Sequence, residues 1–362
     1  MNTRNTYAEV NTQNFLRNIF EISKRSHKHV APVLKADAYG HGAVKMARIC
    51  QDNGIGFLIV AFLEEAIELR DSGIIIPVLV LNYFDPKYVK EAILRDISVT
   101  IFSKDQMMAI NEFIGQGRLK VHLNVDTGMG RLGPSIEEAF ELYEDISKNT
   151  KYILEGLYTH FSSADDPEDP MNLEQINAFQ RFTESIKKPK YIHISNSAAA
   201  TLINPSTGNF SRVGIAAYGL QPSGKQKIDY LRPVMSVHST VAFVKRISKG
   251  RTIGYGHTFV ADGPMTVATI PFGYADGLPR SLSNRGEVLV NGKRSKILGR
   301  VSMDQIVVDV SQVENVNIGD DVVIIGKSGD EEITVEEIAR LDGTINYEIV
   351  CGISKRVPRI YI

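Results

Sequence analysis

Residues 31–42, APVLKADAYGHG, join an apolar, strand-like run to a turn of small residues. The run ends on Lys35, and Tyr39 follows within the turn. Similar apolar runs recur along the chain, separated by amphipathic segments such as 63–73 and 171–188. Continuous apolar runs are typical of parallel strands covered by helices. The expected strands lie within 30–35, 57–62, 77–82, 98–103, 120–125, 155–161, 191–197 and 212–219.

Eight such strand-plus-helix units fit into about 220 residues, close to the ~250 residues of a closed (β/α)8 barrel. An open, doubly wound parallel sheet is the competing interpretation, but it normally needs fewer strands. The predicted fold class is therefore α/β, with a TIM-like barrel forming the first part of the chain.

The pattern changes near residue 231, where β-rich segments replace the alternation. They lie at 234–247, 265–272, 286–299, 305–310 and 320–326. Asn291-Gly292 separates two alternating runs, which is a strong hairpin signal. We therefore expect a barrel domain at 1–230 and a mainly antiparallel β domain at 231–362.

The composition excludes several classes of protein. The 362 residues include 41 basic and 42 acidic side chains, so no basic surplus suggests a nucleic-acid partner. No apolar run is long enough to cross a membrane, and the polar N-terminus lacks a secretion signal. Cys50 and Cys351 lack metal-ligand spacing, so we expect reduced thiols, no metal site and a cytoplasmic location.

Polar residues stand where the predicted strands end, which is where barrels gather their reactive groups. A lysine such as Lys35 is usually a solvated surface residue, but at a barrel mouth it can form a Schiff base with a carbonyl compound. Six further residues stand at or near the ends of predicted strands. Each alone has a plain structural explanation, whereas together they favour a binding or catalytic site. They are Arg131, His160, Asn196, Ser197, Arg212 and Gly214.

Barrels often bind phosphate with the loops after strands seven and eight. The Ser197 hydroxyl and the backbone N–H groups of Gly214 and Ile215 are candidate donors to such an anion. A Schiff-base lysine beside a phosphate site is the requirement of pyridoxal 5′-phosphate. Lys35 would bind its aldehyde, and Tyr39 would reach its phosphate.

These segments resemble the bacterial alanine racemases. The likeness runs in order through VLKADAYGHG, VDTGMGRLG, GLYTHF, SNSAA, RVGIAAYGL, GYG, GYADGLPR, GRVSMDQ and INYEI, over essentially the whole chain. The resemblance implies a cytoplasmic homodimer with shared active sites that interconverts L- and D-alanine on pyridoxal phosphate. It also implies a supply of D-alanine for peptidoglycan.

The resemblance also assigns roles to residues. It implies that Lys35 carries the cofactor as a Schiff base and that Tyr255 of the partner subunit acts on the opposite face. Arg212 would face the pyridine nitrogen, with His160 beside the ring. Tyr39, Ser197, Gly214, Ile215 and Tyr347 would bind the phosphate, with Asn196 beside them. Arg131 and Met303 would bind the substrate carboxylate, and Asp165, Tyr274, Arg280 and Arg300 would line the entrance.

One position departs from the family pattern. Many members carry a carboxylated lysine just before the VDTGMGR segment, where this chain has Asn124. An amide cannot form a carbamate, so we expect a bound chloride near Asn124 and Arg131 to supply the negative charge.

Two bases on opposite faces of a planar cofactor can exchange an α-proton without moving around the substrate. Arginine can only donate hydrogen bonds, so Arg212 would disfavour a protonated pyridine nitrogen and limit transamination. The alternatives are a decarboxylase of the same plan, a non-catalytic pyridoxal-phosphate carrier and a broader racemase that accepts serine.

Overall fold

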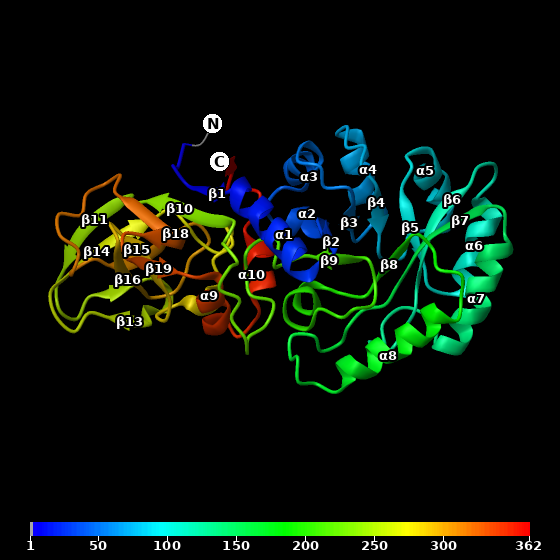
Figure 1. Cartoon of the computed structure of the whole chain (residues 1–362). Helices are drawn as coiled ribbons and strands as arrows, with labels where there is room; N and C mark the ends of the chain where they lie inside the picture. The colour runs from blue at the N-terminus through cyan, green and yellow to red at the C-terminus, as the bar shows by residue number, and fades with distance from the viewer. Residues whose placement is uncertain (1–2) are drawn as a thin grey trace. The chain divides into compact units, whose positions relative to one another are not determined.

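The computed structural model describes residues 3–362. Internal contacts divide the chain into two compact units (Figure 1). The barrel unit comprises Leu16–Ala38 and Gly42–Leu231, and the β unit comprises Met1–Phe15, Tyr39–His41 and Arg232–Ile362. Each unit is described separately below.

Eight parallel strands form the barrel unit. Strands β3 to β8 are hydrogen bonded in sequence order, and β2 pairs with β9. A bridge between Val33 and Ile59 joins β2 to β3, and the Arg212 N–H donates to the Ser195 carbonyl at 2.9 Å beside β8 and β9. These links close the barrel, which confirms the predicted fold class. The strands are β2 His29–Pro32, β3 Leu58–Val60, β4 Val78–Val80, β5 Ser98–Ile101, β6 Leu119–Asn124, β7 Tyr152–Tyr158, β8 Tyr191–His193 and β9 Phe210–Val213.

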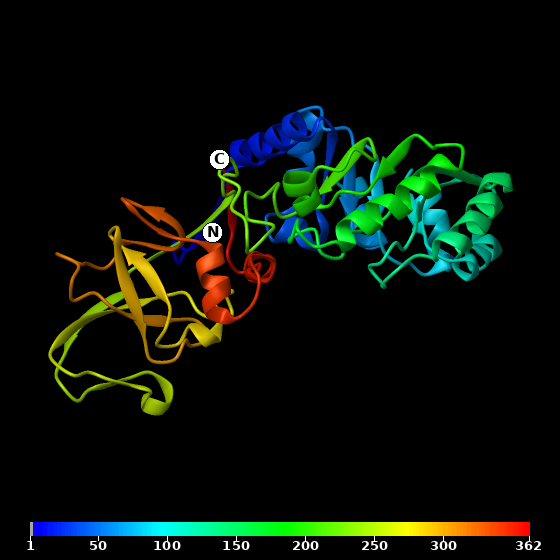
Figure 2. The ribbon, with the colours of Figure 1, turned by 60° about the horizontal axis from the view of Figure 1, so that its bottom comes forward.

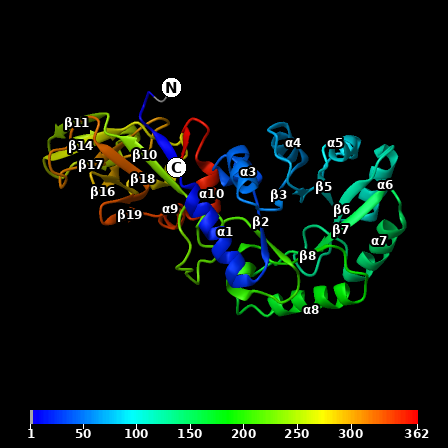
Figure 3. The same ribbon diagram turned by 45° about the horizontal axis from the view of Figure 1, so that its top comes forward.

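Helices lie outside these strands, as Figures 2 and 3 show for α6, α7 and α8. Local sequence sets several of their ends: the Ser135 hydroxyl accepts from the Glu138 N–H, and the Glu138 carboxylate accepts from the Ser135 N–H. The helices are α1 Thr12–Ser26, α3 Ala43–Asp52, α4 Leu63–Asp71, η1 Pro86–Tyr88, α5 Val89–Leu94, α6 Lys104–Phe113, α7 Ile136–Lys148, α8 Met171–Glu184 and η2 Ala199–Ile203.

The β unit is built on a mainly antiparallel sheet with the order β11-β14-β17-β16-β15-β18-β10-β1-β20, and β19 pairs with β18. Asn291 and Gly292 have φ values of 48° and 75° between β15 and β16, which confirms the predicted hairpin. The sheet strands are β1 Tyr7–Val10, β10 Met235–Thr240, β11 Phe243–Ile247, β14 Met265–Ile270, β15 Glu287–Val290, β16 Lys293–Leu298, β17 Ile306–Asp309, β18 Asp321–Ser328, β19 Glu331–Ile333 and β20 Arg359–Tyr361. A second pair, β12 Thr252–Ile253 with β13 Phe259–Val260, and the helical segments η3 Tyr255–His257, η4 Arg280–Leu282, α9 Val335–Asp342 and α10 Asn346–Gly352 complete the unit.

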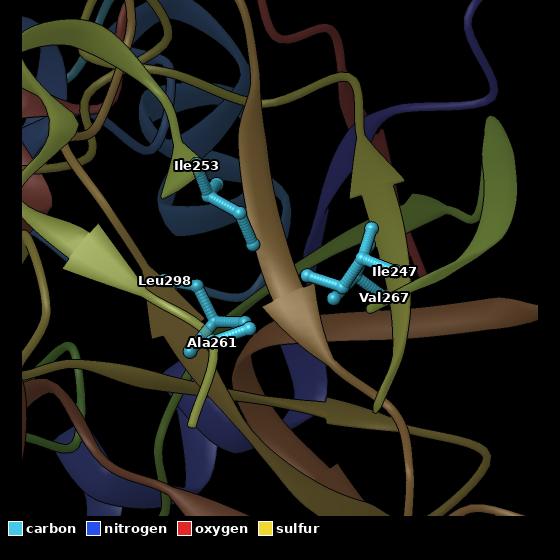
Figure 4. Packing of buried hydrophobic residues seen from close by; sticks show 5 residues of the cluster. All are labelled: Ile247, Ile253, Ala261, Val267 and Leu298. Carbon is cyan, nitrogen blue, oxygen red and sulfur yellow. The ribbon is translucent and has the colours of Figure 1, made fainter. Parts of the chain in front are cut away.

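A small apolar core holds the β12–β13 hairpin to the sheet. Its side chains come from both the hairpin and strands β11, β14 and β16, and they point toward one another (Figure 4). Burial of such aliphatic groups contributes roughly 1.5–3 kcal/mol for each large side chain. The members are Ile247, Ile253, Ala261, Val267 and Leu298.

The first strand lies outside the expected barrel segment. We assigned residues 1–230 to the barrel, whereas β1 pairs antiparallel with β10 and parallel with β20 in the β unit. Ala8 and Val10 are fully buried there. Four alternating residues are too short a pattern to indicate which sheet they join.

No helix within residues 3–362 is long and apolar enough to span a membrane.

Candidate active site

Lys35 lies directly after the last paired residue of the first barrel strand. Regular β2 ends at Pro32, and the bond from the Leu34 N–H to the Ile59 carbonyl, at 2.7 Å, continues the pairing. The half-buried Lys35 then begins a turn, α2 Lys35–Tyr39. The predicted strand 30–35 therefore ends earlier than expected, and Lys35 lies just beyond it instead of being its last residue.

The turn after Lys35 is left-handed. Ala36, Asp37, Ala38 and Tyr39 all have φ between 53° and 54°, although none of them is glycine. Left-handed backbone costs roughly 1–2 kcal/mol for each such residue, so other interactions must hold the turn. Two carboxylates do so: Glu65 accepts from the Ala36 N–H, and Asp37 accepts from the Ala43 N–H, both at 2.7 Å.

Glu65 was not among the predicted site residues. Its other carboxylate oxygen accepts from the N–H groups of Ala61 and Phe62, at 2.7 and 3.1 Å. It therefore braces the strained turn against the start of α4. The sequence carries one signal for it, because an acidic residue in the first turn of a helix commonly caps that helix.

We expect Glu65→Ala to lower the free energy of unfolding by about 2 kcal/mol, because it leaves three backbone donors without their acceptor. Adding Ala36→Gly should recover part of this loss, since glycine adopts the left-handed conformation without a Cβ penalty. Urea unfolding measures both effects. The exposed neighbour Glu64→Ala is the matched control and should change stability by less than about 0.5 kcal/mol. Equal losses with and without Ala36→Gly would contradict the role of strain.

The segment that follows the turn, Tyr39–His41, is held within the β unit. Gly40 has φ of 78°, and a Cβ at this position would collide with the Val350 carbonyl of α10. The Arg359 guanidinium donates to the Gly40 carbonyl at 2.9 Å. The rings of Tyr39 and Tyr347 lie 6.0 Å apart, centre to centre. Two of the predicted phosphate-binding residues are thus brought together.

A second group of predicted phosphate-binding residues meets at the ends of β8 and β9. The Ser197 hydroxyl accepts from the Gly214 N–H at 2.9 Å and from the Ala216 N–H at 3.4 Å. Gly214 and Ile215 begin a turn closed by the bond from the Ala217 N–H to the Gly214 carbonyl, at 2.8 Å. Hydroxyl and backbone N–H groups at the start of a turn are the donors that anions prefer. Asn196 caps the adjoining segment by accepting from the Ala199 N–H at 2.9 Å.

Arg212 is 3% exposed, and no carboxylate within residues 3–362 pairs with it. Its guanidinium donates to the backbone carbonyls of Thr159, His193 and Ile194 at 2.9, 2.9 and 3.3 Å. It also bonds to the Nδ1 atoms of His193 and His160, at 2.9 and 3.1 Å. Burial lowers the pKa of Arg212 to about 10, so the group stays charged near neutrality.

His160 is kept neutral by its surroundings. Burial lowers its pKa well below the ordinary value, and the positive charges of Arg212, Arg131 and Lys35 lower it further. The positive charges of three predicted site residues therefore act on the same imidazole. The His160 carbonyl is held by the Gln175 amide at 2.9 Å.

The loop after β6 carries Arg131 on its exposed face. The Asp126 carboxylate shapes this loop by accepting from the N–H groups of residues 128, 129 and 130 at 2.8–2.9 Å. The Asn124 amide donates to the Leu132 carbonyl at 2.8 Å. Asp165 lies on an exposed loop, where its carbonyl accepts from the Ser223 hydroxyl at 2.6 Å.

In the β unit, Tyr255 occupies the tip of the β12–β13 hairpin and is 72% exposed. Gly254 and Gly256 flank it with φ near 70°, and a Cβ on Gly256 would lie 3.2 Å from the Arg300 guanidinium carbon. Arg300 therefore packs directly against the turn that presents the phenol.

The other predicted entrance residues lie on two adjacent loops of the β unit. The N–H groups of Tyr274 and Ala275 donate to the carbonyls of Ser302 and Met303, both at 3.0 Å. Arg280 is exposed at the start of η4. The predicted site residues thus form one set in the barrel unit and one in the β unit. The first comprises Lys35, Arg131, His160, Asp165, Asn196, Ser197, Arg212, Gly214 and Ile215, and the second comprises Tyr39, Tyr255, Tyr274, Arg280, Arg300, Met303 and Tyr347.

Comparison with known proteins covers both units. A family model described as alanine racemase, N-terminal domain, matches residues 10–222, and one described as alanine racemase, C-terminal domain, matches residues 234–361. An alanine racemase of Carboxydothermus hydrogenoformans is 41% identical, covering 99% of this chain and 100% of its own. The crystal structure of alanine racemase from E. faecalis superposes with a TM-score of 0.94 at 38% identity, covering 99% of this chain and 98% of that one. A Bacillus anthracis alanine racemase with bound L-Ala-P gives 0.91 at 39% identity, covering 99% and 95%.

The closed parallel barrel and the antiparallel β unit match both domains of this family, whose curated relatives are isomerases, and the chain is an enzyme of that class. The two family matches span nearly the whole sequence in the same order. The chain belongs to the alanine racemase family.

Proposed function

We propose that the protein interconverts L-alanine and D-alanine on pyridoxal 5′-phosphate, with Lys35 and Tyr255 of the partner subunit as the two bases. One observation carries the proposal: in a member of this family, Lys35 follows β2, which pairs with β9, the strand that carries the buried Arg212. We propose that this activity supplies D-alanine for peptidoglycan.

The donor set fits the cofactor. The Ser197 hydroxyl, whose oxygen accepts from the Gly214 N–H, and the N–H of Ile215 suit its phosphate at the Gly214 turn. The terminal nitrogens of Arg212 already donate to protein acceptors and no carboxylate competes for the group, so its Nε–H would be the donor toward the pyridine nitrogen. Tyr39 and Tyr347 would add phenol groups at the phosphate, with Asn196 shaping the adjoining turn. When bound, the cofactor supplies an aldehyde for Lys35 and an electron-withdrawing ring that acidifies the α-hydrogen of the amino acid.

Arg212 would restrain the reaction. It is buried, charged and able only to donate, so at the pyridine nitrogen of a bound cofactor it would oppose a proton. Arg212 would thereby favour return of the proton to the α-carbon over transamination. The absence of a carboxylate beside Arg212 in residues 3–362 supports this role.

A phenol ordinarily loses its proton near pH ~10, so the partner's Tyr255 needs positive charge nearby to act as a base. Because Arg212 donates to Nδ1 of neutral His160, the Nε2 atom of His160 carries a proton. This N–H is suited to donate to a phenolate and would transmit the influence of Arg212. We propose, from the family membership, that the enzyme is a homodimer with shared active sites.

Substrate selection would depend on small size and a carboxylate. Arg131 and the Met303 backbone would bind the carboxylate of alanine. Tyr274 and Tyr347 would narrow the entrance, together with Asp165, Arg280 and Arg300. A methyl side chain fits such a narrow mouth better than a longer one.

Incubating the cofactor-loaded enzyme with L-alanine tests the proposal. Chiral analysis should show approach to equal amounts of the two enantiomers. Release of carbon dioxide would instead indicate a decarboxylase, and a bound cofactor without turnover would indicate a carrier. Faster conversion of L-serine than of L-alanine would assign the broader racemase activity.

We also propose that a chloride ion binds between Asn124 and Arg131. Asn124 uses one amide N–H for the Leu132 carbonyl, and the side chain is 6% exposed, so its second N–H needs an acceptor. Crystals grown with bromide should show an anomalous peak beside this amide. Asn124→Asp supplies a fixed negative charge and should lose the peak. Only water at this position in bromide crystals would contradict the proposal.

A further inference from the structure

Two fully buried imidazoles extend from Arg212 into the barrel. The guanidinium lies 2.9 Å from His193 Nδ1, and His193 Nε2 lies 2.8 Å from His122 Nδ1. Both histidines have zero exposure. The His193 ring is stacked between Tyr158 and Phe210, with centroid distances of 4.8 and 4.2 Å, so its position is fixed.

The chain of bonds has one direction. A guanidinium only donates, so His193 Nδ1 must accept and its proton must lie on Nε2. That N–H donates to His122 Nδ1, which leaves the His122 proton on Nε2. Burial and the charge of Arg212 lower the pKa of His122 to about 3 and the pKa of His193 well below its ordinary value. Both rings therefore stay neutral, with one tautomer each.

The last imidazole in this series of hydrogen bonds, His122, carries a buried donor that is costly to leave unpaired. His122 Nε2 has no hydrogen-bond partner within residues 3–362. A buried donor without an acceptor costs about 1–3 kcal/mol. The surroundings are aromatic: Phe57 and Tyr191 lie 5.9 and 5.8 Å from the His122 ring centre. Phenylalanine would fill the same space but would leave the buried His193 Nε2–H without its acceptor, so the imidazole is explained by hydrogen bonding rather than by packing.

The neighbouring strand makes room for the same ring. Gly156 of β7 faces His122, and a Cβ at Gly156 would collide with the imidazole at Nδ1. Strand β7 therefore carries no side chain at the position that faces His122 Nδ1, the atom that accepts from His193. The space beside Gly156 accommodates the ring, and the bond from His193 requires an acceptor at this point.

We propose that His122 is a positioning residue for Arg212. By accepting from His193 Nε2, it polarises His193 so that Nδ1 accepts more strongly from the guanidinium. Arg212 is thereby held in one orientation without a carboxylate, whose charge would offset the arginine. The proposal rests on the proposed function, in which Arg212 faces the pyridine nitrogen.

The bond directions can be tested without the cofactor. In apoprotein with 15N-labelled histidine, NMR spectra should assign His122, His160 and His193 as neutral Nε2–H tautomers from pH ~8 down to pH ~5. A proton on Nδ1 of His193 or His122, or titration of either ring in this interval, would contradict the inferred directions of the hydrogen bonds. This result does not depend on racemase activity.

The positioning role is tested with His122→Phe and His122→Asn. In His122→Phe the unpaired donor moves from residue 122 to His193, so the number of unpaired donors is unchanged and the melting temperature should stay within a few degrees. The loaded variant should racemise alanine about tenfold more slowly. It should also form more pyridoxamine phosphate and pyruvate per turnover. His122→Asn keeps an acceptor near the Nδ1 position and should restore the wild-type ratio of transamination to racemisation.

Phe57→Leu is the packing control, because it alters the ring environment of His122 without removing the acceptor. It should leave the ratio of the two reactions unchanged. A His122→Phe variant that melts much earlier yet keeps the wild-type ratio would show a purely structural role. A wild-type protein that binds the cofactor without racemising alanine would contradict the proposed function. The tautomers in the apoprotein would still test the inferred hydrogen bonds independently.

Discussion

Replacing Lys35 with alanine should give a folded protein that neither racemises alanine nor shows the visible absorbance of the lysine-bound cofactor. The substitution removes the amine that binds the aldehyde and the base on one face of the substrate. Loss of a general base alone typically costs 10²–10⁴-fold in rate, so a fall of about a thousandfold or more is expected. Absorbance spectra of the reconstituted variant and chiral analysis measure the two losses.

The control for this variant is Lys90→Ala, which removes an exposed lysine of α5 in the same unit. It should keep both the absorbance and the rate. Circular dichroism should show that the Lys35 variant retains its helices and strands. Racemisation at a comparable rate by Lys35→Ala would refute the assignment of this residue.

The second large effect is expected from Tyr255→Phe. This variant keeps the covalent link to Lys35 and therefore its visible absorbance, but it lacks the acid and base on the opposite face. Racemisation should fall by about 10²–10⁴-fold. The remaining exchange of the α-hydrogen with deuterated solvent should be confined to one enantiomer, because one base remains. Tyr83→Phe, at an exposed tyrosine of the barrel unit, is the control.

Mixing the two inactive variants tests whether the sites are shared between subunits. In a heterodimer of Lys35→Ala with Tyr255→Phe, one site combines both defects and the other has neither. Random reassociation of a symmetric dimer should therefore restore up to about a quarter of wild-type activity. Sites built within single chains would restore none, and that result would refute the shared arrangement.

The sequence predicted the barrel because its strands are buried on both faces and therefore read as continuous apolar runs. It did not predict where the last two strands end. Runs 191–197 and 212–219 looked like whole strands, whereas β8 ends at His193 and β9 ends at Val213. Apolar residues continue beyond both ends because the following turns are also buried, as Ala198 and Ile215 show.

The positions of the candidate site residues in the barrel could be predicted from the sequence, because a barrel gathers its strand ends at one face. The left-handed turn could not be predicted, since alanine and tyrosine rarely adopt positive φ and one aspartate is only a weak signal for it. Glu65 and the His122–His193 pair depend on contacts between segments far apart in sequence. Hydrophobic periodicity contains no information about such pairs.

Strands β1 and β20 bear on how the molecule is assembled. Ala8, Glu9 and Val10 pair with Arg359, Ile360 and Tyr361, so two segments far apart in sequence lie side by side. The barrel segment is consequently inserted in sequence between two pieces of one sheet, so the sheet is complete only when β20 pairs with β1. Removing a few C-terminal residues would strip that sheet of its edge strand, whereas joining the two ends and opening the chain elsewhere would preserve it.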